Sequence, residues 1–182
     1  MLKLRPYKCS DAETIISWCK DESSFRCWTS DRYDHFPITA ADMNHKYVDC
    51  NGDCPESDNF YPVTAVDGGE VVGHMILRYT DAAQQTLRFG FVIVDDARRG
   101  MGYGKGMIRL AQRYAFGILG AEKVTLGVFE NNLPAYRCYQ AAGFRKVEQE
   151  VHRSCRVGDE TWRIIEFEMT KAEYAKTEPP QG

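Results

Sequence analysis

Several features that would place the chain in a membrane-spanning, secreted or nucleic-acid-binding class are missing from the sequence. No apolar run approaches the roughly 18 residues of a membrane span. The first residues, Met1 to Pro6, lack the apolar stretch and cleavage site of a signal peptide. The 26 acidic side chains outnumber the 23 basic ones, and a net charge of -3 offers nucleic acid no basic footprint. We therefore expect a cytoplasmic protein that binds neither membrane nor nucleic acid.

The sequence also lacks internal repeats and low-complexity blocks that would divide it. A chain of 182 residues, 43% hydrophobic and 27% charged, has the size and composition of one globular domain with a real core. Only the end, Thr177-Glu178-Pro179-Pro180-Gln181-Gly182, has a disordered composition. We expect a single domain over residues 1–175 and a disordered tail over 176–182.

Cysteine is present, but not in a pattern typical of metal sites or disulfide frameworks. The seven cysteines form an odd, scattered set, which without a secretion signal predicts reduced thiols. Cys50 and Cys54 are close together, but no second Cys/His pair lies at zinc-finger spacing. We therefore expect no disulfide and no metal.

Apolar alternation and turn residues outline a mixed fold. Strands are expected over residues 2–7, 60–66, 70–79, 86–94, 123–129, 144–155 and 161–169, with Asp67-Gly68-Gly69 as a hairpin turn. Helices are expected after Ser10 or Asp11, over 39–48, from the turn near 103 to Gly120, and over 132–142, whereas 21–37 has no period. This order predicts an α+β (mixed α/β) fold, a mostly antiparallel sheet with helices on both faces.

The third of these helices has an apolar stripe. Residues at offsets of 0, 3, 4, 7 and 11 should face the core: Met107, Leu110, Ala111, Tyr114 and Ile118. The opposite face carries Arg109, Gln112 and Arg113.

A glycine-rich turn joins the fourth expected strand to this helix. Its sequence is Arg99-Gly100-Met101-Gly102-Tyr103-Gly104-Lys105. A helix N-terminus presents unpaired N–H groups, and glycines let an anion approach them closely, so the turn suits a pyrophosphate. The spacing fails both the Walker pattern and the dinucleotide pattern G-x-G-x-x-G. The pattern that remains is R-x-x-G-x-G, formed by Arg99, Gly102 and Gly104. The alternative to a phosphate-binding loop is a glycine-rich turn that binds no ligand.

A second segment follows the fifth strand. Asn132 is a good helix cap and Pro134 fits the first turn, with Ala135, Cys138 and Tyr139 on one face. By itself, Tyr139 is more typical of a core aromatic residue than of a catalyst.

Together the two segments resemble the GCN5-related N-acetyltransferase (GNAT) superfamily, including its branch that acetylates ribosomal and other protein N-termini. Arg99-x-x-Gly102-x-Gly104 resembles its pyrophosphate loop, and Asn132-x-x-Ala135-x-x-x-Tyr139 with Gly143-Phe144 resembles its second signature. The resemblance covers about residues 60 to 170. It implies the acyl-CoA N-acyltransferase fold, with the sheet splayed between the fourth and fifth strands, which end at Val94 and Phe129.

The resemblance also implies acetyl-CoA as co-substrate and a set of site residues. The pantetheine arm would pair with the backbone of Val92, Ile93 and Val94, and Asn132 would contact the coenzyme. The pyrophosphate would be held by Arg99 and the amides of Gly100, Met101, Gly102, Tyr103, Gly104 and Lys105. Tyr139 would reach the sulfur as general acid, a role that contributes about 10²- to 10⁴-fold to the rate.

No side chain can be named as the general base. Some family members place Glu or His on the strand before the loop, where this chain has Arg88 and Gly90, or Glu in the next strand, where it has Gly127. Glu130 is typical of a solvated carboxylate at a strand end. An ordered water relay is therefore the expected base.

The acceptor is predicted as a primary amine, of a small molecule or a protein N-terminus. Acidic and aromatic residues between Asp21 and Phe36 would hold a cationic amine by charge and cation–π contact, or would form a solvated loop over the core. The protein is expected as a monomer or homodimer. The alternatives are a non-catalytic acyl-CoA sensor on the same fold and a nucleotide-binding module.

Overall fold

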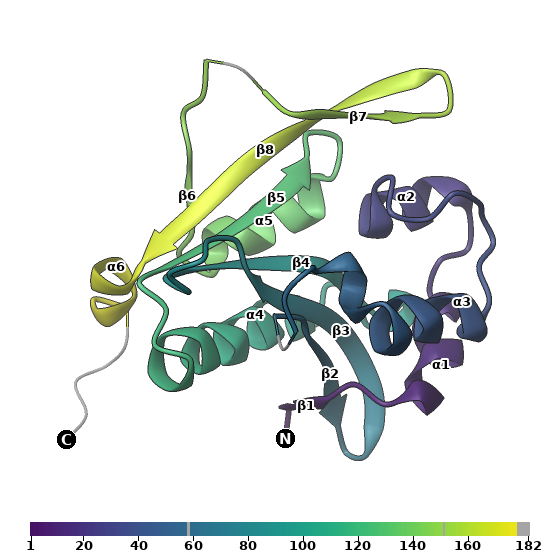
Figure 1. Cartoon of the computed structure of the whole chain (residues 1–182), viewed down its shortest axis with the longest axis horizontal. Coiled ribbons are helices and arrows are strands. Elements are labelled where there is room, and N and C mark those ends of the chain that lie inside the picture. Colours follow the sequence, from purple (N-terminus) through teal and green to yellow (C-terminus); the bar gives the residue numbers. More distant parts are fainter. Residues whose placement is uncertain (58, 151, 178–182) are drawn as a thin grey trace.

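The computed structural model describes residues 1–57, 59–150 and 152–177, and a curved sheet runs through the whole molecule (Figure 1). Its strands lie in the order β1 (Lys3–Pro6), β2 (Tyr61–Asp67), β3 (Glu70–Tyr79), β4 (Thr86–Val94), β5 (Lys123–Phe129), β8 (Glu160–Thr170) and β6 (Arg145–Lys146), with β7 (Ser154–Val157) also paired to β8. Among the strands of the described residues, β4 and β5 alone pair in parallel, and the other pairs are antiparallel. The predicted mixed fold with a mostly antiparallel sheet is confirmed.

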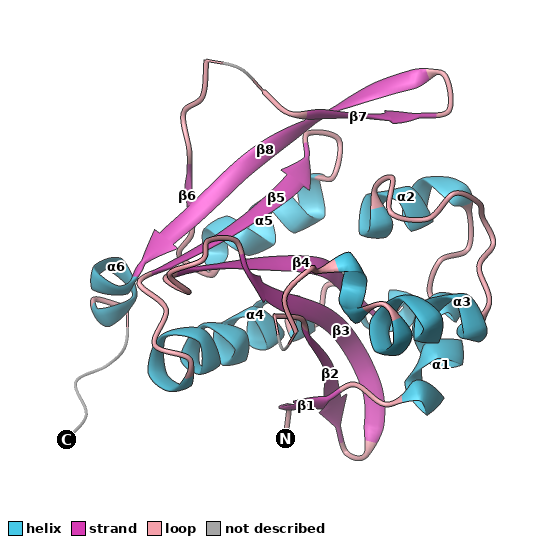
Figure 2. Cartoon of the chain, viewed as in Figure 1, coloured by secondary structure: helices cyan, strands magenta, loops and turns pink. Residues whose placement is uncertain are grey.

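The helices pack on the two faces of this sheet (Figure 2). On one face, α1 (Ala12–Ser17), α2 (Glu22–Thr29) and α3 (Ala40–Asn44) share a core with Ile76 of β3 and Ile93 of β4. On the other, α4 (Tyr103–Arg113) and α5 (Leu133–Ala141) pack with Met75 and Leu77. Neighbouring strand residues point to opposite faces, so β3 contributes to both cores.

Helix α2 is the main departure from the sequence expectation, which found no period over residues 21–37. The Asp21 carboxylate accepts the N–H of Ser24, and the Ser24 hydroxyl lies 3.3 Å from the N–H of Asp21, forming a capping box. Phe25, Trp28 and Thr29 are buried at offsets of 0, 3 and 4. The helix has only eight residues, and a pattern this short falls below the window in which helical periodicity is readable.

The predicted strand over residues 144–155 is wrong. Within the described residues, regular strand is confined to the two residues of β6 and to β7, which begins at Ser154; Val147 and Arg153 add single backbone bonds to Glu166 and Ile164 of β8. Between β6 and β7 lie Glu148, Gln149 and Glu150, and the first and last of these are residues that strands disfavour.

The C-terminal end also differs from the sequence expectation. Thr170 and Glu173 form a capping box that begins a short helix, α6 (Lys171–Ala175). The pattern T-x-x-E was present in the sequence and could have predicted it. Of the predicted disordered tail, 176–182, only Lys176 and Thr177 belong to the described residues, and their N–H groups bond back to α6.

The predicted apolar stripe of the third helix is only half correct. Met107 and Ala111 are fully buried, but Ile118 is 71% exposed, and Gln112 is buried with its amide donated to the carbonyl of Ala142. After Arg113 the helix widens into a π turn over Tyr114–Ile118. The wider turn changes the rotation per residue, so the offsets beyond Arg113 no longer stay on one face.

Within the described ranges, no helix has the length and apolar character needed to cross a membrane. The seven cysteines carry free thiols: Cys9, Cys19, Cys27, Cys50, Cys54, Cys138 and Cys155.

The thiols give a direct test of the expected reduced state. Alkylation of denatured protein without a reductant should add seven labels, as measured by intact mass. In the native protein, exposed Cys9 should react first, because burial raises the pKa of Cys19, Cys27 and Cys138 and keeps them as the less reactive thiols. A mass two labels short, with a bridged Cys50–Cys54 peptide, would contradict the expectation.

Candidate active site

The site is built on a split in the sheet. Strands β4 and β5 pair only where Thr86–Phe89 lies beside Lys123–Leu126. Both strands then continue, to Val94 and Phe129, and diverge from their common end (Figure 2). The backbone edges that face each other across this gap are not paired to one another, as expected from the sequence.

A β-bulge lies in β4 at the split. Between the pairs His74–Ile93 and Ile76–Gly90, one residue of β3 lies opposite two of β4. One of these two is Phe91, whose φ of 48° is rare for a residue with a side chain. The indole N–H of Trp28 donates to the Phe91 carbonyl at 2.9 Å and holds this conformation. No sequence pattern marks the bulge.

A cavity of about 620 Å³ runs from the split to the start of α4. Ten of the twelve predicted site residues line it: Val92, Ile93, Val94, Arg99, Gly100, Gly102, Gly104, Lys105, Asn132 and Tyr139. The side chains of the other two lie outside, because Met101 is 67% exposed and the Tyr103 hydroxyl donates to Asp67. For these two residues, only a backbone role remains as a prediction.

The start of α4 is suited to an anion. The N-cap, Gly102, has a φ of 88°, which favours glycine, and no acidic residue occupies the first turn. The first N–H to reach a backbone acceptor is that of Gly106. Within the described residues, the N–H groups of Tyr103, Gly104 and Lys105 have no acceptor, so they and the helix dipole present positive charge to the cavity.

Tyr139 reaches the same cavity from α5. The Asn132 side chain caps this helix by accepting the N–H of Ala135, and Pro134 occupies its first turn. Tyr139 is 5% exposed, and its ring packs edge-on against Phe167. Burial raises the pKa of the Tyr139 phenol, which is therefore protonated at neutral pH. Its hydroxyl makes no hydrogen bond to the residues that the structure describes.

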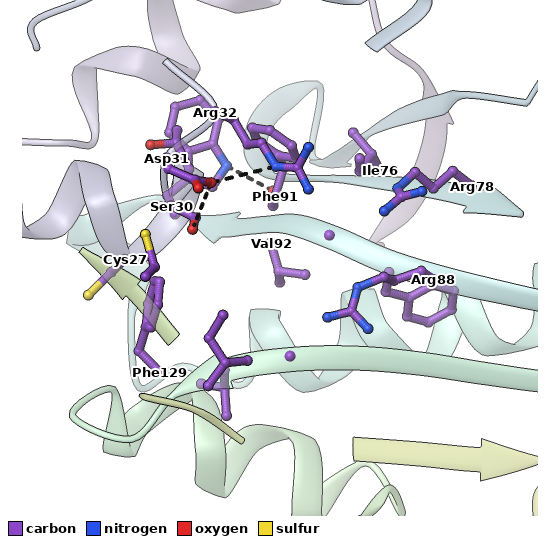
Figure 3. Close-up of a pocket in the computed structure, with 18 of the residues that line it drawn as sticks. Cys27, Ser30, Asp31, Arg32, Ile76, Arg78, Arg88, Phe91, Val92 and Phe129 are labelled. Atoms are coloured by element: carbon purple, nitrogen blue, oxygen red, sulfur yellow. Dashed lines mark hydrogen bonds and ion pairs between the residues drawn. The ribbon is translucent and has the colours of Figure 1, made fainter. Parts of the chain in front are cut away.

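A second cavity, of about 200 Å³, is lined by residues of β3, β4, β5 and the loop after α2 (Figure 3). Five residues line both cavities, so the two meet at Cys27, Trp28, Val92, Asn132 and Tyr139. Of these, Cys27 was not predicted as a site residue, since α2 itself was missed, and Trp28 was considered only as one of the aromatic residues that could hold the amine. The Tyr139 phenol therefore lies where a group in the larger cavity would meet a group in the smaller one.

Comparison with known proteins decides the family. The family model described as "Acetyltransferase (GNAT) family" matches residues 14–144. The chain belongs to this family. It is an N-acetyltransferase, and the transfer of an acetyl group to an amine is its reaction.

The relatives of this acetyltransferase include two from Bacillus subtilis. One is an uncharacterized N-acetyltransferase, YokL, derived from the SPbeta prophage, 28% identical over 77% of this chain and 76% of its own. The other is a spermine/spermidine N(1)-acetyltransferase, 27% identical over 53% of this chain and 66% of its own. Among solved structures, spermidine N-acetyltransferase from Vibrio cholerae, in complex with CoA and spermine, matches with a TM-score of 0.79. It is 18% identical over 96% of this chain and 98% of its own.

An ion pair involves one of the positions where some GNAT proteins place a base, that of Arg88. Arg88 donates two hydrogen bonds to Glu166 of β8, at 2.8 and 3.1 Å. A Cβ at Gly127 would lie only 2.7 Å from the Arg88 guanidinium, so glycine makes room for the pair. Glu130 is exposed and lines neither cavity. Sequence reasoning missed Glu166, because only the pairing of β5 with β8 brings it opposite Gly127.

Within the segment 21–36, only part of the acidic and aromatic set lines the smaller cavity, namely Trp28 and Asp31, and a contact between these residues and an amine stays a prediction. Phe25, Trp28 and Tyr33 are buried in the core beneath α2. The carboxylates are used locally: Asp21 caps α2, Glu22 pairs with Arg26 at 3.2 Å, and Asp31 lies 3.9 Å from Arg32. Among the described residues, no three His, Cys, Asp or Glu side chains gather as metal ligands would.

Proposed function

We propose that this acetyltransferase binds acetyl-CoA in the larger cavity and an amine in the smaller one, with Tyr139 at their junction as general acid. The unpaired N–H groups at the start of α4 suit a pyrophosphate, with Arg99 and Lys105 beside them. The unpaired edge of β4 over Val92, Ile93 and Val94 suits the amide groups of a pantetheine arm. Asn132 uses its carbonyl oxygen as a helix cap, which leaves its NH₂ group to donate to the coenzyme.

The reaction requires the amine nitrogen to form a bond to the acetyl carbon while the carbon–sulfur bond breaks. Acetyl-CoA supplies the activated thioester, and holding it beside the amine lowers much of the barrier. Tyr139 gives its proton to the departing thiolate, and bulk water then restores that proton. The amine loses its extra proton to water, because the pair between Arg88 and Glu166 leaves no free carboxylate at the positions of the family base. The unbonded Tyr139 hydroxyl at the junction is the observation that carries this assignment.

The acceptor is a primary amine of a small molecule or of a protein N-terminus. Two of the similar proteins carry the names of polyamine acetyltransferases, so spermidine and spermine belong in any acceptor screen beside peptides and amino acids.

The coenzyme assignment is tested by a matched pair of glycines at the two ends of α4 and its π turn. Gly102 and Gly120 both have positive φ, and a Cβ on either would enter open space. Only Gly102 lines the cavity. Gly102→Ala should weaken acetyl-CoA binding by roughly tenfold or more, about 1.4 kcal/mol, whereas Gly120→Ala should bear a similar backbone strain and bind normally. Isothermal titration measures both, and equal affinities in the two folded variants would contradict the assignment.

A further inference from the structure

The smaller cavity is lined by more positive than negative side chains, although the whole chain is acidic. Five cations line it, against two aspartates: Arg32, Lys46, Arg78, Arg88 and Arg153, with Asp31 and Asp53. These cations come from the loop after α2, from the π turn after α3, from β3, from β4 and from the segment before β7. They converge only in the folded molecule.

Four of the five cations have a carboxylate partner. Lys46 pairs with Asp53, and Arg32 lies 3.9 Å from Asp31. Arg88 and Arg153 share one carboxylate, Glu166, at 2.8 and 3.6 Å.

Arg78 is the exception. It is half-buried on β3, and no carboxylate of the described residues lies within ion-pair distance of it. Its register partner on β4 is Arg88, so two guanidinium groups occupy directly opposed positions on the sheet. Like charges in such positions repel, and a half-buried charge without a partner is costly. Burial lowers the pKa of Arg78, and the charges of Arg32, Arg88 and Arg153 act in the same direction.

We propose that the acceptor of this acetyltransferase carries an anionic group, a carboxylate or a phosphate, which Arg78 binds with Arg32 and Arg88 beside it. This inference rests on the proposed function and names its acceptor class. An oxyanion would supply the partner that Arg78 lacks among the described residues, since a guanidinium matches carboxylate and phosphate oxygens in bidentate geometry.

The lining of the cavity indicates where the amine end and the anionic end of such an acceptor would lie. Arg78, Arg88, Arg32 and Val92 all line this cavity. In Figure 3 the side chains of Val92 and Arg88 lie on one side of the β4 ribbon, and Arg32 and Arg78 lie on the other. Val92 also belongs to the junction with the larger cavity, where Tyr139 lies. An amine at the junction can therefore carry its anionic group toward Arg78. A polyamine, which is positive along its whole length, would meet the same positive charges unfavourably.

The first experiment compares matched amines in an acetyl-CoA thiol-release assay. The two members of each pair differ only in the anionic group: β-alanine is compared with propylamine, and phosphoethanolamine with ethanolamine. Spermidine is tested beside them as a cationic acceptor. We expect kcat/KM for the better anionic member to exceed that of its neutral partner by about tenfold or more, the effect of a charge-assisted hydrogen bond. The two pairs distinguish carboxylate from phosphate.

The second experiment removes the charge from Arg78. In Arg78→Gln, KM for the anionic amine should rise about tenfold, while kcat and the KM of the neutral amine change little. Arg109→Gln removes an exposed charge from α4, outside the cavity, and should change neither. The loss is expected in KM because the anion is bound equally in the ground and transition states.

The outcomes separate this inference from the proposed function. Acetylation without any preference for the anionic members, or with spermidine as the best acceptor, would overturn the anion site and leave the acetyltransferase assignment intact. If no acceptor turns over, isothermal titration of CoA-bound protein with phosphoethanolamine decides the matter. Binding that Arg78→Gln weakens supports the anion site, and equal or absent binding in both proteins overturns it.

Discussion

Tyr139→Phe should lower kcat by roughly 10²-fold or more with the best acceptor, because it removes the proton donor for the departing thiolate. The ring that packs against Phe167 is kept, so the melting temperature and acetyl-CoA affinity should change little. The loss falls on kcat and kcat/KM together, as expected for an interaction made only in the transition state. On the purified full chain, steady-state kinetics measures kcat and kcat/KM, and calorimetry measures the melting temperature and the acetyl-CoA affinity.

Tyr136 provides a matched control on the same helix. Its ring also packs edge-on against Phe167, with centroids 5.1 Å apart, but it lines neither cavity. Tyr136→Phe should retain kcat. If Tyr139→Phe also retains kcat and instead loses stability, Tyr139 is a core aromatic residue and the general-acid assignment falls. Binding of acetyl-CoA without turnover of any amine by the wild-type chain would instead favour the sensor alternative.

The direction of the pKa shift of Tyr139 predicts how the reaction rate depends on pH. A general acid must be protonated, and activity that depends on it is lost as pH rises through its pKa. Burial raises this pKa above the ordinary value, which is about 10 for tyrosine. The phenol itself should therefore cause no fall in the wild-type rate below about pH 10.

Glu166→Ala should cause the largest loss of stability among the single changes considered, about 3 kcal/mol. The Glu166 side chain is 9% exposed and accepts two hydrogen bonds from Arg88, whose side chain is 20% exposed. Without it, a mostly buried guanidinium would have no counter-charge. In a chain of this size, the melting temperature should fall by about 6–12 °C, as measured by calorimetry.

Two further variants test whether the loss of stability in Glu166→Ala comes from leaving the Arg88 charge without a partner. Glu122→Ala breaks an exposed pair with Lys171 and should cost less than about 1 kcal/mol. Replacing both partners, as in Arg88→Met with Glu166→Leu, should recover much of the stability, because no buried charge is then left alone. A loss in Glu166→Ala no larger than that in Glu122→Ala would show that the pair contributes little.

The sequence predicted the parts of the site that are encoded locally. The glycine turn before α4 and the Asn132–Tyr139 segment each lie within one stretch of chain, where spacing and cap preferences can be read directly. The positive cavity could not be predicted, because it depends on strand register. Arg78 and Arg88 are cross-strand partners, and Glu166 lies 78 residues beyond Arg88. The bulge at Phe91 depends in turn on Trp28, from a helix too short to be recognised.

The short pairing between β4 and β5 also has a mechanical consequence. In the described residues, the strand group β1–β4 is paired with the group β5–β8 through four pairs of facing residues, which end at Phe89 and Leu126. Beyond these pairs, the two strand groups are joined by no strand pairing among the residues that the structure describes. The angle between the two groups can therefore widen without breaking a hydrogen bond between β4 and β5. The spacing of the two strand groups at the open end therefore depends on the packing of side chains such as Trp28 and Tyr139, rather than on the fixed distance between paired strands.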